Sequence, residues 1–214
     1  MLPEQLIERC KERIKPYACE GFVYGKGPRH PILMFVGEAP GETEIENGIP
    51  FSGRAGKEFN HFLDHLGVTR EDIFITSAVR SRPYKWGQPR GKEKRKYNRT
   101  PNQKEIAAHA PILDAEIAYA EPKVIVPMGR IAYWRLLGEN PRMEEVTGSF
   151  ITSPIRELDD WDKNTYRITA DTYTLFPIYH PAAILYRRRL ETAMYEHLDR
   201  LKAYLAIEKK DKSP

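Results

Sequence analysis

The 214-residue sequence has only two cysteines, Cys10 and Cys19, and no apolar run near the roughly 18 residues of a membrane span. So few cysteines argue against a disulfide-stabilised secreted fold. The first fifteen residues are charged throughout, unlike a secretory signal. A composition of 41% hydrophobic and 30% charged residues excludes low-complexity and disordered classes. We therefore predict a cytoplasmic, monomeric protein with no membrane partner, folded as a single domain over residues 1–214.

Positive charge is concentrated in one stretch of the chain. Residues 80–99 hold nine lysines and arginines against the single acid Glu93, so the rest of the chain is net acidic although the whole carries +4. A basic segment on an acidic body is typical of a polyanion-binding face, although a solvated loop has the same composition. Tyr84, Trp86 and Tyr97 lie within it and offer rings that stack on bases, which favours nucleic acid.

Short apolar runs alternate with amphipathic helical patterns along the chain. This order predicts an α/β fold of three layers, α/β/α, with a short, mostly parallel four-stranded central sheet. For the third helix, Thr100 is the expected N-cap and Pro101 the first residue. Residues 140–172 are polar and are interpreted as irregular, with a hairpin as an alternative. The expected strands are 31–36, 72–79, 123–127 and 174–178, and the expected helices are 56–66, 100–120, 130–137 and 191–205.

Ligands of such sheets bind beyond the carboxyl ends of the strands, and the unusual residues of this sequence fall there. The turn 37–41 after the first strand contains two glycines and a proline, and it is followed by several acids. Carboxylates at a strand end suit the activation of water or the stabilisation of a cationic transition state. Glu38 and Glu44 are the candidates, because Glu42 and Glu46 are explained more simply as solvated loop acids.

Two further strand-end segments carry candidate groups. Phe51 lies between a proline and a Ser-Gly pair, where its ring either meets a planar ligand or joins the core. His180 is followed by Pro181 at the end of the last strand, and its imidazole is placed to donate to a developing oxyanion. The apolar pair 184–185 next to three arginines suits a wedge inserted into duplex DNA, with an ordinary helix start as the alternative.

Several motifs together resemble the uracil-DNA glycosylase superfamily, most closely its family 4, over about residues 32–201. The resemblance implies removal of uracil, or a related deaminated base, by hydrolysis of the N-glycosidic bond of a flipped-out nucleotide, leaving an abasic site. Alternatives are a DNA- or damaged-base-binding protein of this fold with little or no catalysis, and a different α/β hydrolase or nucleotide-binding enzyme with an unrelated substrate. The motifs are Val36-Gly37-Glu38-Ala39-Pro40-Gly41, residues 48–56, Asn98-Arg99-Thr100-Pro101, residues 123–130 and His180-Pro181.

The resemblance also implies roles for individual residues. Glu38 and Glu44 match the carboxylates that position water or stabilise the sugar cation, and we favour Glu38. Phe51 matches the ring that stacks on uracil, and His180 the histidine that hydrogen-bonds uracil O2. The expected base-binding residues are Gly37, Ala39, Pro40, Gly41, Phe51 and Ser77. The expected DNA contacts are Arg82, Lys94, Arg95, Lys96, Asn98, Arg99, Ile184, Leu185, Arg187 and Arg188.

The sequence departs from the family in its cysteines. Family 4 enzymes hold an iron–sulfur cluster with four cysteines, whereas this chain has two, with Ser81 and His109 at the other two positions. We therefore expect no cofactor. A zinc ion held by Cys10, Cys19 and His109 is a weaker alternative.

Two more departures concern the base and the DNA. Ser77 stands where the family has an asparagine that reads the uracil edge, so specificity is expected to be relaxed unless Asn47 or Asn98 reaches in. The basic loop at 84–98 resembles an insertion in a covalent branch of the superfamily. Asn98 replaces the histidine of that branch, and an amide is a poor nucleophile. We therefore predict that this loop binds phosphates and that no covalent capture occurs.

Overall fold

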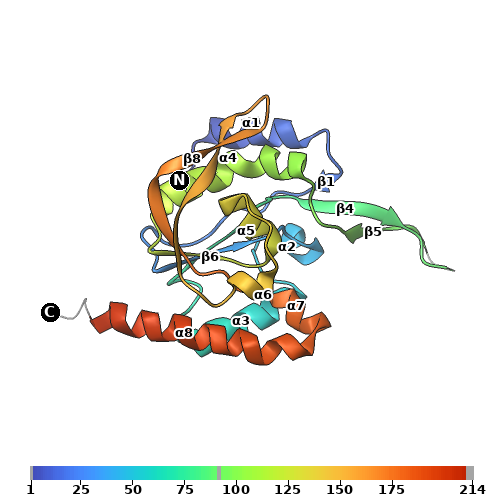
Figure 1. The fold of residues 1–214 in the computed structure, drawn as a ribbon. Helices are drawn as coiled ribbons and strands as arrows, with labels where there is room; N and C mark the ends of the chain where they lie inside the picture. The colour runs from blue at the N-terminus through green and yellow to red at the C-terminus, as the bar shows by residue number, and fades with distance from the viewer. Residues whose placement is uncertain (1, 91–92, 211–214) are drawn as a thin grey trace.

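The computed structural model describes residues 2–90 and 93–210, and its centre is a five-stranded sheet (Figure 1). The strand order is β3-β2-β6-β8-β7, in which all neighbours are parallel except β8 and β7. The strands are β2 (Leu33–Gly37), β3 (Phe74–Ser77), β6 (Val124–Pro127), β7 (Ile151–Asp160) and β8 (Thr165–Leu175). The mostly parallel sheet confirms the predicted fold class, and the predicted number of four strands is corrected to five.

The fifth strand arises from the polar stretch that the sequence left open. Strands β7 and β8 form a long antiparallel hairpin, in which Ile151 pairs with Leu175 and Asp160 with Thr165. Only the last part of β8 enters the parallel sheet, where Leu175 pairs with Ile125. Most side chains of the hairpin are at least partly exposed, so it lacks the continuous apolar run by which the core strands were recognised.

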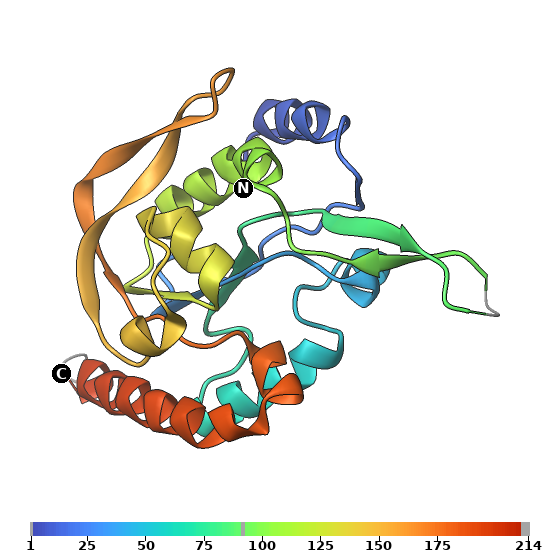
Figure 2. The same ribbon diagram turned by 45° about the vertical axis from the view of Figure 1, so that its right-hand side comes forward.

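Strand β2 is buried on both faces, and its side chains alternate between two helical layers. Leu33 and Phe35 pack with α3 (Arg54–Leu66) and α8 (Glu191–Lys210). Met34 and Val36 pack on the other face with α4 (Gln103–Ala120) and α5 (Arg130–Leu137). Figures 1 and 2 show these layers above and below the sheet, with α1 (Glu4–Ile14) outside α4. The three-layer arrangement is therefore present.

Helix α4 begins two residues later than predicted, because its N-cap is Asn102 instead of Thr100 and its first residue is Gln103 instead of Pro101. Its N-cap is Asn102, whose side chain accepts a hydrogen bond of 3.0 Å from the Glu105 amide. The Glu105 carboxylate in turn accepts one of 2.8 Å from the Asn102 amide. This reciprocal capping box satisfies two backbone donors, whereas Thr100 caps no helix.

The basic segment forms a β-hairpin instead of the predicted loop. Strand β4 (Arg82–Gly87) pairs with β5 (Arg95–Asn98), with Trp86 opposite Lys96, and the short strand β1 (Cys19–Glu20) completes this second sheet. The hairpin projects from the body of the molecule (Figure 2). Residues 91 and 92, which lie between the two strands in the sequence, are outside the described residues.

Four short elements complete the chain. They are α2 (Glu42–Asn47), α6 (Met143–Val146), α7 (Pro181–Tyr186) and the 3-10 helix η1 (Arg188–Leu190). Within residues 2–90 and 93–210, no helix has the length and apolar character needed to cross a membrane.

Candidate active site

A cavity of about 330 Å³ opens at the carboxyl ends of the parallel strands. These ends lie side by side because Gly37 pairs with Ser77 and Val36 with Pro127. The cavity therefore lies where the sequence predicted a ligand site. Among its lining residues are Ala39, Pro40, Gly41, Glu44, Phe51, Thr76, Ser77, Arg80, Asn98, His180, Leu185 and Tyr186.

Phe51 presents its ring to the cavity from an unusual backbone conformation. Its φ is +53°, in the left-handed region that large residues rarely adopt. Arg70 holds this turn by donating to the carbonyls of Pro50 and Phe51, at 2.8 and 2.5 Å. The ring lies over Gly37, where a Cβ would come within 2.7 Å of the phenyl carbon Cζ. The glycine is therefore required for the ring to reach this position.

His180 is the N-cap of α7 and lines the cavity across from Phe51, with ring centroids 5.8 Å apart. Its Nδ1 accepts a hydrogen bond of 3.2 Å from the Ala182 amide. Burial lowers the pKa of His180 to about 4, so the ring is neutral near pH 7. With Nδ1 as acceptor, the proton of the neutral ring is on Nε2, which is free to donate.

Glu38 follows β2 and immediately precedes the lining residues Ala39 and Pro40, but neither Glu38 nor Gly37 is itself among the lining residues of the described cavity. Its side chain is half-buried. Burial raises the pKa of the Glu38 carboxyl above its ordinary value, and the nearby Arg130 guanidinium partly opposes this rise. A carboxylate with a raised pKa is a stronger base than an ordinary one, which suits proton abstraction from water.

Glu44 lies differently from Glu38, because both of its carboxylate oxygens accept backbone hydrogen bonds. One accepts from the Gly41 amide at 3.1 Å and the other from the Gly53 amide at 2.9 Å. Glu44 therefore ties the acidic turn to the loop that carries Phe51. It also lines the cavity.

Three of the residues expected to contact DNA are engaged with other parts of the protein. Arg82 is buried and paired with Glu20 and Glu42, while Arg99 makes two hydrogen bonds to the Glu105 carboxylate, of 2.7 and 2.5 Å. Ile184 is packed in the core against α3 and α8. The predictions for Arg82 and Ile184 are corrected, because an ion-pair network and core packing bury these side chains. Arg99 is 24% exposed, so its contact with DNA stays a prediction.

The other expected DNA contacts are accessible to different degrees. Lys96 is half-buried and paired with Glu20, and Asn98 accepts a 2.6 Å hydrogen bond from Arg82 Nε. Lys94 and Arg95 are exposed and lie over the rings of Trp86 and Tyr97. Leu185 of α7, Arg188 of η1 and Arg187 between these two helices are exposed.

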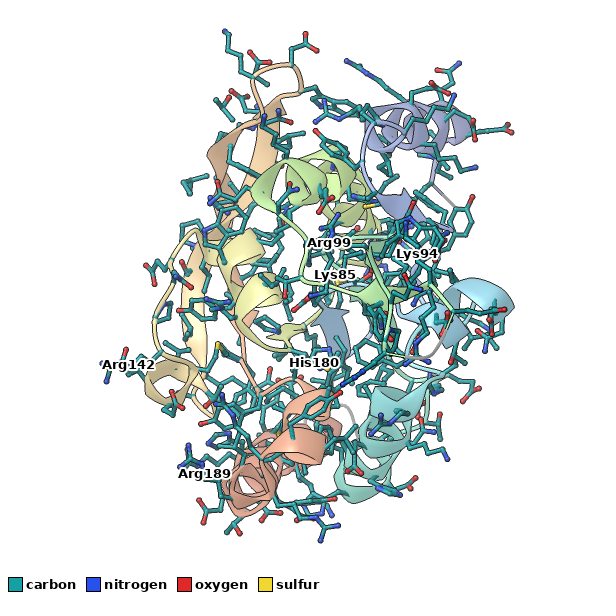
Figure 3. The ribbon with its side chains drawn as sticks, turned by 90° about the vertical axis from the view of Figure 1, so that its right-hand side faces the viewer. Lys85, Lys94, Arg99, Arg142, His180 and Arg189 are labelled. Carbon is teal, nitrogen blue, oxygen red and sulfur yellow. The ribbon has the colours of Figure 1, made fainter. Side chains whose placement is uncertain are left out.

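Several basic side chains lie on the same face of the molecule as His180. In the view of Figure 3, Lys85, Lys94 and Arg99 lie above His180, while Arg142 lies to its left and Arg189 below it and to the left. Tyr186, 77% exposed and lining the cavity next to Leu185, was missed by the sequence analysis. The sequence of α7 could have indicated Tyr186, because Ile184, Leu185 and Tyr186 are consecutive large residues of one helix. Ile184 is buried in the core, which leaves Leu185 and Tyr186 exposed.

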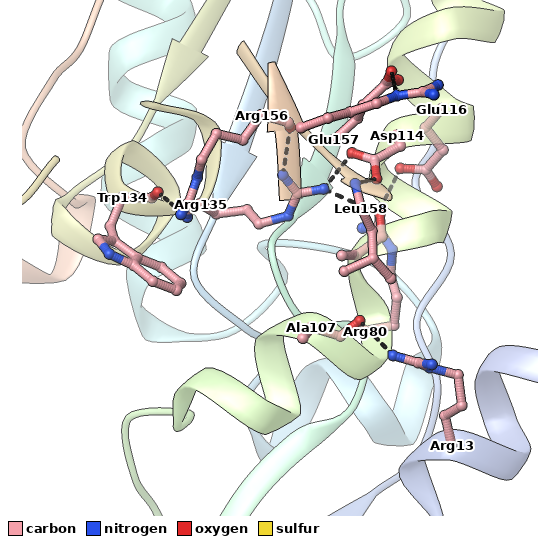
Figure 4. A network of polar contacts seen from close by, with 12 residues as sticks. Arg13, Arg80, Ala107, Asp114, Glu116, Trp134, Arg135, Arg156, Glu157 and Leu158 are labelled. Carbon is pink, nitrogen blue, oxygen red and sulfur yellow. Dashed lines mark hydrogen bonds and ion pairs between the residues drawn. The ribbon is translucent and has the colours of Figure 1, made fainter. Parts of the chain in front are cut away.

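A buried polar network lies under the cavity. Arg80 is 1% exposed, pairs with Glu116 of α4 and donates to the Ser77 hydroxyl at 3.3 Å. Glu116 also accepts from the Thr76 hydroxyl and the Gly25 amide. Arg80 and Glu116 belong to the wider network of Figure 4, in which Asp114 accepts from Arg135 and the Leu158 amide and so anchors the β7–β8 hairpin.

Arg80 was read as part of the basic surface, and its place in the cavity wall was missed. The only sequence signal was Glu116, an acid within a largely apolar helix. Of the two amides considered as substitutes for the missing asparagine, Asn98 lines the cavity. Asn47 does not, because it bonds to Ser52 and to the Ile49 amide outside the described cavity.

The residues at the family's cluster positions do not fit a four-thiolate iron–sulfur group. His109 contacts Ser81 at 3.2 Å and the Glu105 carbonyl at 2.7 Å, so these two positions satisfy each other. Burial raises the pKa of Cys10 to about 11 and that of Cys19 to about 12, which keeps both thiols protonated. Within the part of the chain that the structure describes, no three histidine, cysteine or acidic side chains gather in a way that could hold a metal ion.

Comparison with known proteins identifies the family. Residues 24–205 match the model of the uracil DNA glycosylase superfamily. The chain belongs to this superfamily. It is 35% identical to a type-4 uracil-DNA glycosylase of Saccharolobus solfataricus over 86% of this chain and 76% of that protein. It is 31% identical to the type-4 uracil-DNA glycosylase of Thermotoga maritima, over 96% of this chain and 97% of that one.

A third relative with the same name, from Archaeoglobus fulgidus, is 33% identical over 79% of this chain and 74% of that protein. These matches confirm the predicted resemblance to the superfamily and to its family 4. The cavity is lined by residues of the same segments that carry the resemblance to the family, namely 37–41, 48–56, 98–101 and 180–181.

Proposed function

We propose that this protein excises uracil, or a related deaminated base, from DNA by hydrolysing the N-glycosidic bond of a flipped-out nucleotide. The observation that carries the proposal is the cavity that Phe51 and His180 share, with Glu38 beside it. The names of the relatives agree with it. The partner is therefore DNA, and the product is an abasic site.

The base stacks on Phe51, whose ring is already fixed by Arg70 and Gly37. As the C1′–N1 bond breaks, its electron pair passes to the base, and negative charge develops on N1 and O2. The neutral His180 ring donates its Nε2 proton in a hydrogen bond to O2 and stabilises that charge. A neutral donor suits this role, because it requires no buried cation before the reaction begins.

The other half of the reaction is the attack of water on C1′. Glu38 in its ionised form takes a proton from this water as the new C1′–O bond forms. Its negative charge also stabilises the positive charge that develops on the sugar. Glu44 supports both steps indirectly, because it fixes the acidic turn relative to the Phe51 loop.

The DNA strand would follow the basic side chains on the face of the molecule that carries His180. Lys94 and Arg95 of the hairpin and Arg187 and Arg188 beyond α7 are exposed and suited to phosphate contacts. Leu185 and Tyr186 at the cavity rim would fill the space left by the flipped base. We further propose that the protein acts in the cytoplasm as a monomer, that residues 1–214 form one domain and that the segment 84–98 is its DNA-binding insertion.

An oligonucleotide assay tests this function. Single-stranded and duplex DNA carrying one uracil are incubated with the full chain, treated with alkali and separated on a gel. Alkali-dependent cleavage at the uracil, and none in the matched thymine oligonucleotide, is the expected result. Salt-dependent binding without cleavage would support a binding protein of the same fold instead, and the absence of both would reject the proposal.

A further inference from the structure

Two polar side chains on the cavity wall, Ser77 and Arg80, contact each other and have no other role in the proposed chemistry. Ser77 is the last residue of β3, and Arg80 follows it by three residues in a segment whose Ala78 and Val79 amides donate to the carbonyls of Gly37 and Glu38. Whatever base enters the cavity meets these groups in addition to Phe51 and His180. Their hydrogen-bonding capacity therefore decides which base edge fits.

The hydroxyl proton of Ser77 is already used in a hydrogen bond within the protein. Its hydroxyl donates to the Val79 carbonyl at 2.7 Å and accepts from an Arg80 nitrogen at 3.3 Å. A hydroxyl has one proton and two lone pairs, so one acceptor position remains. Toward a ligand, Ser77 thus acts as an acceptor.

Arg80 has donors to spare. Of its five N–H groups, one is directed to Ser77 and one to Glu116, and Nε is buried without a partner among the described residues. Glu116 is held in turn by Thr76 and by the Gly25 amide, so the guanidinium is fixed from below. Since an arginine has no acceptor, it can recognise only an acceptor on a ligand.

We propose that Arg80 is a specificity-determining residue that acts with Ser77 as a composite reader of the base edge. The pair matches an edge on which an N–H donor adjoins a carbonyl acceptor, with the N–H on Ser77 and the carbonyl on Arg80. Uracil presents this edge at N3 and O4. The proposal rests on the proposed function and names the chemical class of base that it takes.

The same pair rejects cytosine. Its N3 is an acceptor facing the lone pair of Ser77, and its 4-amino group is a donor facing the Arg80 guanidinium. Both contacts are mismatched, and mismatched polar groups in a closed site cost far more than a missing apolar contact. Thymine and hypoxanthine share the donor–carbonyl edge, so this reader does not separate them from uracil.

Inhibition by free bases tests the reader. Single-turnover excision of uracil by the full chain is measured with added uracil, 3-methyluracil, which lacks the N3 donor, or 4-thiouracil, whose sulfur is a poor acceptor. The wild type is expected to bind each analogue at least about 10-fold more weakly than uracil, the effect of one lost hydrogen bond in a buried site. Failure of the wild type to excise uracil would reject the proposed function before any variant is compared.

The variants separate the two halves of the reader. In Ser77→Ala, the affinity for 3-methyluracil should come within about threefold of the affinity for uracil, while 4-thiouracil should still bind more weakly than uracil, as in the wild type. Arg80→Lys keeps a cation for Glu116. In this variant, uracil and 4-thiouracil should bind with similar affinity, while 3-methyluracil should still bind more weakly than uracil. Asn47→Ala, outside the described cavity, is the control and should leave both differences unchanged. Thermal unfolding identifies a misfolded Arg80 variant, in which case Ser77→Ala decides alone. An active wild type whose 3-methyluracil difference survives Ser77→Ala would overturn the reader.

Discussion

The cavity and the β4–β5 hairpin both use aromatic and basic side chains, but they balance charge in opposite ways. In the cavity, Arg80 is buried against Glu116 and His180 is neutral. On the hairpin, Lys94 and Arg95 are exposed over aromatic rings, and neither forms an ion pair with an acid of the described residues. Fixed, neutralised groups suit chemistry on one base, whereas free cations attract phosphates at a distance. The two functions should therefore be separable by mutation.

The largest separation is expected at His180. His180→Ala removes the donor to the developing oxyanion and should slow single-turnover excision by about 10²- to 10³-fold. Binding to uracil-containing DNA, measured by fluorescence anisotropy, should stay near the wild-type value. The matched control is His61→Ala, an exposed histidine of α3, which should change neither quantity. A His180 variant that loses binding and rate in parallel would break the comparison.

Arg82, the buried arginine at the start of β4, is expected to stabilise the fold and not to contact DNA. Arg82→Ala leaves Glu20 without one of its cations and is expected to lower the free energy of unfolding by about 1–3 kcal/mol, less than for a fully buried pair because Glu42 is exposed. Urea unfolding measures this change. The salt dependence of DNA binding by the folded variant should stay close to that of the wild type, and a strongly flattened dependence would place Arg82 on the DNA after all.

The hairpin end should show the reverse pattern. Lys94→Ala with Arg95→Ala is expected to reduce the slope of log affinity against log salt by about two, the loss of two phosphate contacts on duplex DNA. Excision at saturating protein should hardly change. Lys163→Ala, near the turn of the β7–β8 hairpin, is the control for an exposed basic side chain elsewhere. An unaltered slope in the double variant would mean that this hairpin does not contact phosphate.

The smallest expected effect is a shift in the pH dependence of the rate, which tests Glu38 as the base. The rate should fall as the pH is lowered through the raised pKa of Glu38, because the carboxylate loses its charge by gaining a proton. His180, with a pKa of about 4, stays neutral over this range. Arg130→Gln removes the cation that opposes the rise, so the acid limb of the profile of kcat/KM against pH should move upward by less than about one unit. A downward move would exclude Glu38 as the base.

The sequence predicted the cavity because its parts are local. Short apolar runs mark the buried strands, and the turns that follow them carry Glu38, Phe51 and His180 with their glycines and prolines. The shape of each turn depends on neighbours a few residues away. Strand pairing then brings the turns together, because parallel strands end at one edge of the sheet.

The fate of the arginines could not be predicted in the same way, because it depends on distant partners. Arg80 meets Glu116, 36 residues further on, and Arg82 meets Glu20, 62 residues back. Nothing in the local composition distinguishes these cations from Lys94 and Arg95. The hairpin was missed for a related reason: its pairing rests on aromatic and cationic contacts between the two strands, and its charge resembles that of a solvated loop.

The left-handed backbone at Phe51 has a consequence for how a base is captured. A conformation of this kind costs about 1–3 kcal/mol, and that cost falls on the folding of the chain, where Arg70 and the core offset it. A nucleotide that swings out of the helix therefore meets a ring already set in place. No loop has to lose its freedom at that moment. Arg70 thus supports the binding of a flipped-out base through its hydrogen bonds to the Phe51 turn, although it is not one of the residues that line the cavity.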